Sequence, residues 1–170
     1  MNLFIRVLSS IDRVLGIILR GLTMACLVIL LLLIAGRVFV RFVPIMSFGW
    51  SDEIIEWTFA WLVFIGVAAL WRDNEHFRVE WLSYKLKGKK IGYILEFVID
   101  LISLSFMLVL TYQGWRITVL SQEWTPIFKF PKKLLYMCIP MSGGIMTIYT
   151  FRNIFVHVLA LRDTIMKKGA

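Results

Sequence analysis

Residues 21–36, GLTMACLVILLLLIAG, form an uncharged and strongly apolar stretch that decides the fold class. Three more uncharged stretches follow, at Trp57–Trp71, Leu101–Trp115 and Leu134–Phe151. A helix needs about 20 residues to cross the hydrocarbon core of a bilayer, and each stretch reaches that length when the charged residues at its ends snorkel or pair. We therefore predict an all-α integral membrane protein with four transmembrane helices, near residues 21–43, 52–71, 92–115 and 134–156.

The composition of the whole chain is typical of a membrane protein. Its 170 residues are 59% hydrophobic and 18% charged, with a mean hydropathy of +0.79, whereas soluble domains are about 45–50% apolar and about 25% charged. The length predicts one membrane domain over residues 1–170. Cys26 and Cys138 lie in apolar stretches, so we interpret both as small core residues. The sequence contains no nucleophile–base constellation, metal-ligand spacing or phosphate-binding loop, so we expect no enzyme, no metal and no cofactor.

The basic residues predict the orientation in the membrane. The net charge of +8 is carried by residues that flank the apolar segments, which favours anionic lipid headgroups over nucleic acid as the partner. When both termini and the middle loop are cytoplasmic, 13 of the 19 Lys and Arg residues are cytoplasmic, as the positive-inside rule requires. We assign Arg72, His76 and Arg78 to this cytoplasmic interface. The basic leader runs into the first apolar stretch without a small-residue cleavage site, so we expect no cleavage.

The N-terminal segment carries a second helical pattern. Residues 3–20 have an apolar stripe at helical spacing, and arginines recur every seven residues on another face. This pattern predicts an amphipathic N-terminal helix, lying either at the membrane surface or as a cytoplasmic extension of the first span.

Charged and aromatic residues gather where the first predicted span ends and the second begins. Arg37 and Arg41 share a helical face, and Arg37, the deeper of the two, is expected to be the buried partner of an acid after the short loop. One interpretation is purely structural. The arginines snorkel to the membrane surface, Ser51 caps the second predicted helix, and the acids in its first turn favour the positive end of the helix dipole. The other interpretation is functional: the arginines and acids form ion pairs, within this chain or with a partner protein. We take the whole cluster as the candidate partner interface: Arg37, Arg41, Trp50, Ser51, Asp52, Glu53, Glu56, Trp57 and Trp61.

Other polar residues lie near the predicted cytoplasmic side. Glu96 and Asp100 share a face of the third span, too shallow for a proton relay, and we expect them to pair with basic residues at similar depth: Lys89, Lys90 or Arg72. His76 and His157 are peripheral, so we interpret each as a solvated or interfacial histidine and not as a haem ligand.

The residues above occur in a characteristic order. The first half contains Arg37, Trp50-Ser51-Asp52-Glu53, the run Trp57–Gly66, Arg72, His76 and Arg78; the second contains Thr125-Pro126, Pro131, Tyr136, Ile139-Pro140 and Gly143. This order and spacing resemble the small membrane subunit of the tripartite ATP-independent periplasmic (TRAP) transporters over nearly the whole chain. The Trp-Ser-Asp/Glu-Glu element is the most specific part. The run Phe128-Lys129-Phe130 is bulkier than the family pattern.

The resemblance implies a four-helix Q (DctQ-like) subunit, a multi-pass protein of a bacterial inner membrane. In that family a large M subunit carries the substrate and sodium sites and moves as an elevator, and a periplasmic substrate-binding protein docks on the complex. The Q subunit would brace the scaffold of M without carrying the substrate site itself. The cargo would be an organic anion of the sialic-acid or C4-dicarboxylate class. The overall pattern of the chain is more similar to the sialic-acid branch of the family. The alternative, from composition alone, is an independent small four-helix transporter or channel.

Overall fold

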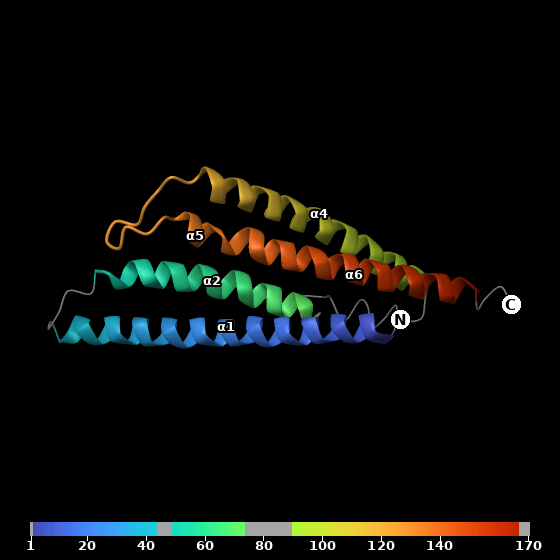
Figure 1. Cartoon of the computed structure of the whole chain (residues 1–170), viewed down its shortest axis with the longest axis horizontal. Helices are drawn as coiled ribbons and strands as arrows, with labels where there is room; N and C mark the ends of the chain where they lie inside the picture. Colours follow the sequence, from blue (N-terminus) through green and yellow to red (C-terminus); the bar gives the residue numbers. More distant parts are fainter. Residues whose placement is uncertain (1, 44–48, 74–89, 167–170) are drawn as a thin grey trace.

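The computed structural model describes residues 2–43, 49–73 and 90–166. These residues form the helices α1 (Asn2–Phe42), α2 (Ser51–Arg72), α4 (Lys90–Leu120), the short α5 (Lys133–Tyr136) and α6 (Cys138–Met166) (Figure 1). Four helical segments in the described part are long and apolar enough to cross a membrane: Ser9–Phe42, Ser51–Arg72, Phe97–Leu120 and Lys133–Leu159. The prediction of an all-α protein with four spans is therefore confirmed.

The bounds of the helices differ from the predicted ones in three main places, one of which is the fourth helix, since α6 runs to Met166 rather than ending near residue 156. The N-terminal segment is not a separate surface helix, because α1 is continuous from Asn2 to Phe42, so the interpretation as an extension of the first span is the correct one. The third helix ends at Leu120 rather than near residue 115. The charge of Arg116 does not terminate it, because that side chain lies on the exposed surface of α4.

The four long helices lie side by side in one layer, in the order α1, α2, α6, α4 (Figure 1). α2 and α6 are central, while α1 packs along α2, and α4 packs on α6 and α5. α1 begins and α6 ends at the same end of the layer, which we call the terminal end (Figure 1). The connection formed by residues 121–132 lies at the opposite end, which we call the loop end.

Small side chains allow the helices of the layer to approach closely. On α2, Ala68 packs with Met107 of α4 and Met146 of α6, and the next residue, Ala69, packs with Leu19 and Ile65. On α6, a Cβ added to Gly143 would come within 2.5 Å of the Thr111 hydroxyl oxygen of α4. Such small residues are typical of helix contacts inside membranes, and Gly143 allows close packing of α6 on α4.

A single layer leaves most of its apolar side chains uncovered by this chain. Both edge helices and the outer surface of α6 expose large apolar residues, for example Met24, Ile102 and Ile148. In a bilayer such a surface faces lipid or another membrane protein. The layer therefore offers wide apolar faces and has little interior of its own.

Candidate functional site

Glu53 fastens the loop end of the layer. It lies buried in the first turn of α2, and its carboxylate accepts the backbone N–H groups of Ile127 at 2.5 Å and Phe128 at 3.1 Å. The hydroxyl of Thr125, which accepts the Phe130 N–H at 3.0 Å, contacts the same carboxylate. Hydrogen bonds from N–H groups to an ionised carboxylate are among the stronger ones in proteins. Glu53 thus holds residues 121–132 against the start of α2.

Of the acids that follow the short loop, Glu53 bonds to backbone amides, and Arg37 pairs with Asp52 instead. Residues 125–130 fold back on themselves, with Lys129 at a φ of 56° and the Thr125 N–H bonded to the Phe130 carbonyl oxygen at 2.9 Å. This turn leaves the amides of Ile127 and Phe128 without partners inside the loop. They meet Glu53 because the loop crosses the beginning of α2, an arrangement that spacing along the chain does not reveal.

The aromatic residues of the predicted cluster have two different neighbourhoods. The ring of Trp57 lies 6.1 Å from that of Phe130, which in turn stacks 5.8 Å from Phe128. Together with Ile54 and Glu53 these rings line an apolar pocket of about 260 Å³. Trp61, one turn further along α2, instead packs against the core between α1 and α2. The bulky Phe128-Lys129-Phe130 run therefore serves to cover the start of α2.

Arg37 pairs with Asp52 across the α1–α2 connection, which is the intrachain version of the predicted ion pair. The described residues alone do not bury Arg37, because 51% of its side chain and 56% of that of Asp52 remain exposed. Arg41 and Glu56 are also exposed.

The predicted cap of α2 is also wrong. The residue before the helix is Trp50, and no side chain caps it. Ser51 is already the first helical residue and is fully buried. The carboxylates of Asp52 and Glu53 in the first turn carry the negative charge that favours the positive end of a helix.

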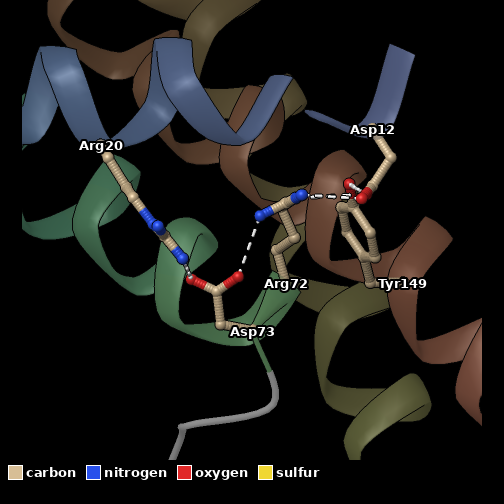
Figure 2. Close-up of polar contacts among 5 residues, drawn as sticks. All are labelled: Asp12, Arg20, Arg72, Asp73 and Tyr149. Atoms are coloured by element: carbon tan, nitrogen blue, oxygen red, sulfur yellow. Dashed lines mark hydrogen bonds and ion pairs between the residues drawn. The ribbon is translucent and has the colours of Figure 1, made fainter. Parts of the chain in front are cut away.

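The terminal end contains a network of five side chains from three helices (Figure 2). Arg72, the last residue of α2, donates from Nε and Nη2 to the two carboxylate oxygens of Asp12 on α1, at 3.2 and 2.7 Å. Its Nη1 donates to Asp73 at 2.9 Å, and Asp73 also accepts from Arg20 of α1 at 2.6 Å. The hydroxyl of Tyr149 on α6 donates to Asp12 at 2.5 Å. The network therefore joins α1, α2 and α6.

Gly16 of α1 makes room for this network. A Cβ added to Gly16 would lie 2.4 Å from Nη1 of Arg72 and 2.5 Å from its Cζ. The guanidinium group thus lies directly over the backbone of α1, and only 15% of the Arg72 side chain is exposed. Close by, the indole N–H of Trp71 donates to the Thr150 hydroxyl at 3.0 Å and adds a second polar link between α2 and α6.

A histidine–carboxylate pair joins α6 to α4. Nδ1 of His157 on α6 lies 2.5 Å from a carboxylate oxygen of Asp100 on α4, and both side chains are largely covered. Of the two interpretations of His157, solvated or interfacial, the solvated one is wrong, as is the pairing of Asp100 with Arg72. The guanidinium group of Arg72 instead donates to Asp12 and Asp73. The side chains of His76, Arg78, Lys89, Lys90 and Glu96 lie outside the described residues.

Sequence reasoning missed three members of the terminal-end network: Asp12, Asp73 and Tyr149. A signal was present for Asp12, because it is the only acid before Asp52 and stands in an otherwise basic and apolar segment. An isolated acid at such a position needs a cation nearby. Nothing in the sequence pattern distinguishes Tyr149 from the other aromatic residues of the fourth span.

The arrangement as a whole puts charge at the two ends of the layer and none in the middle. In the four stretches between residues 21–36, 57–71, 101–115 and 134–151 there is no charged residue. The described residues include no cluster of His, Cys, Asp and Glu that could hold a metal ion. The polar groups fasten helices to each other and to the loop.

Comparison with known protein families gives one match. The family of tripartite ATP-independent periplasmic transporters, DctQ component, matches residues 29–160. That range begins within α1 and ends within α6, so it includes all four spans at least in part. No curated protein matches the chain.

Proposed function

The chain belongs to the DctQ component family of TRAP transporters, and from this membership we propose that it braces the large membrane subunit of a sodium-coupled importer of organic anions. As a DctQ component with four candidate spans, it is a small, multi-pass membrane subunit of the inner membrane. Its family is one of transporter components and not of enzymes. The proposal concerns the bracing role, the sodium coupling and the class of cargo.

The observation that carries the bracing role is the flat, uncharged middle of the layer. Binding sites for substrates and coupling ions in transporters lie near the midplane of the bilayer and are formed by interrupted helices. Within the described spans, α1, α2 and α4 are continuous through their uncharged stretches, and in the fourth stretch the break at Met137, between α5 and α6, lies near the loop end and not at the midplane. A single layer with wide apolar faces is suited to pack against a larger membrane protein.

The surface for this partner is the loop end of the layer near the α1–α2 connection. Here Arg41 and Glu56 are exposed beside the half-exposed pair Arg37–Asp52. Exposed charges of both signs next to apolar helix faces suit polar contacts at the rim of a membrane interface. A periplasmic substrate-binding protein would approach the same end, because we place both termini in the cytoplasm on the distribution of basic residues.

Reconstitution tests the bracing role. The full chain, its co-expressed large subunit and the substrate-binding protein are placed in proteoliposomes, and uptake of radiolabelled sialic acid and of succinate is measured with an inward sodium gradient. We expect uptake of one of these anions by the complete system, and none by this chain alone. Uptake by the chain alone would instead establish an independent transporter. Equal uptake by the system with and without the chain would refute bracing.

Thiol labelling tests the orientation separately. Ile127 is exposed in the loop, and after replacement of Cys26 and Cys138 by serine, I127C supplies a single thiol. An impermeant maleimide should label it in intact spheroplasts. In the opposite orientation, a thiol at residue 87 in the middle loop would be labelled instead.

A further inference from the structure

A polar groove opens at the loop end, on the α4 side of the layer. It has a volume of about 490 Å³ and lies between the last turns of α4, the beginning of the loop and Tyr136 of α5. The candidate span on α4 ends at Leu120, so the groove lies where a helix leaves the hydrocarbon core and meets the headgroup layer.

The groove presents donors that the rest of the chain does not use. The guanidinium group of Arg116 is exposed and takes part in no ion pair among the described residues. The hydroxyl oxygen of Ser121 is buried in the wall of the groove and has no hydrogen-bond partner in the described part of the chain. Buried hydroxyl groups in proteins nearly always have a partner. The orphaned hydroxyl therefore points to a ligand that accepts hydrogen bonds.

The opposite rim of the groove is acidic. Glu123 lines it with 64% of its side chain exposed, and one carboxylate oxygen accepts from Nζ of Lys132 at 2.8 Å. This hydrogen bond raises the pKa of Lys132 above its usual value, and it occupies one of the two carboxylate oxygens of Glu123. Below the rim, the exposed side chains of Ile117 and Leu120 continue the groove onto the apolar surface of α4. The groove thus combines a cation, an acid and an apolar wall.

We propose that this groove binds one phosphatidylethanolamine-type lipid. Arg116 and the hydroxyl of Ser121 donate to the phosphate, the primary ammonium donates to Glu123, and an acyl chain lies along Ile117 and Leu120. A headgroup with both charges suits Arg116 on one side of the groove and, on the other, the carboxylate oxygen of Glu123 to which Lys132 does not donate. A choline headgroup lacks the N–H donors that Glu123 can accept. The site is independent of the bracing role, and only its assignment to the outer leaflet rests on the proposed orientation.

Native mass spectrometry of the full chain in detergent tests the site. The delipidated protein is titrated with palmitoyl-oleoyl phosphatidylethanolamine, phosphatidylglycerol or phosphatidylcholine, and the fraction carrying one lipid is measured. We expect a single site that prefers the ethanolamine lipid. R116Q should weaken its binding about tenfold, as for the loss of a charge-assisted hydrogen bond. K133Q, which removes an exposed cation at the same end of the layer but outside the groove, should leave binding unchanged.

The variant E123Q separates the two halves of the headgroup. It removes the acid and leaves Arg116 in place, so the preference should shift from the ethanolamine lipid toward phosphatidylglycerol. Circular dichroism of each variant verifies that it is folded, and S121A, a smaller change, provides a second measure of the phosphate contact.

Three results would overturn the proposal. Equal binding of the three lipids, with R116Q like the unaltered chain, would mean non-selective annular lipid. Equal competition by free O-phosphoethanolamine at the lipid's own concentration would mean a small-molecule site. Absence of lipid from the purified complex with the large subunit, together with loss of that complex in R116Q, would mean that the groove is a protein interface.

Discussion

Replacing Arg72 with alanine tests whether the terminal-end network holds α1 in the layer. The guanidinium group makes three hydrogen bonds to two carboxylates, and 15% of its side chain is exposed. Breaking a buried ion pair costs about 3–5 kcal/mol, because the remaining charge is uncompensated. Asp12 is 37% exposed and keeps its bond from Tyr149, and Asp73 keeps Arg20. We therefore expect R72A to lower the free energy of unfolding by about 3 kcal/mol, the lower end of that range.

The matched control is R20A. Arg20 pairs with the same Asp73 as Arg72 does, but 64% of its side chain is exposed. Exposed ion pairs contribute about 0–1 kcal/mol. The free energy of unfolding is measured for the full chain in dodecyl maltoside micelles by titration with SDS, with tryptophan fluorescence and circular dichroism as probes. R72M separates loss of charge from loss of the packed side-chain stem and should resemble R72A.

A double-mutant cycle makes the prediction sharper. D12N should lower the free energy of unfolding clearly less in the R72A background than in the unaltered chain, because Arg72, the main partner of Asp12, is already absent. The reasoning is refuted if R72A costs no more than R20A, or if the effects of D12N and R72A simply add. In either case the network would be a surface feature that does not fasten α1.

Three further predictions concern other contacts. Gly→Ala in a helix normally stabilises by about 1 kcal/mol. G16A should instead destabilise the chain, because the added Cβ displaces the guanidinium group of Arg72. In the R72A background G16A should stabilise the chain, as Gly→Ala normally does. E53Q should lower the free energy of unfolding by about 2 kcal/mol, as for weakened hydrogen bonds to a charged acceptor. Amide hydrogen exchange should become faster in residues 121–132, the loop that Glu53 holds, whereas D52N should cause neither effect. R37A should cost at most about 1 kcal/mol in the isolated chain but reduce co-purification with the large subunit, and the swap R37D/D52R should restore part of that yield; wild-type yield in R37A would remove this pair from the interface.

The spans and the helical class could be predicted because hydropathy and length act locally. An uncharged run such as residues 21–36 has to be a helix in a bilayer whatever its neighbours are. The pairing of Arg37 with Asp52 was also within reach, since a short connection brings the two ends together. In contrast, the partners of Glu53 were not predicted, because they are backbone amides more than 70 residues away along the chain.

The order of the helices in the layer decided the remaining contacts. The sequence by itself determined that four apolar helices cross the membrane, that charges lie at their ends, and that residues of the TRAP small-subunit pattern follow one another. It did not determine that α6 lies between α2 and α4. That arrangement places His157 beside Asp100, and the packing of the helices brings Asp12 and Tyr149 together from positions 137 residues apart. Hydropathy acts on each segment alone, whereas the choice among neighbours depends on side-chain fit, such as the bare backbone of Gly16 beneath the guanidinium group of Arg72.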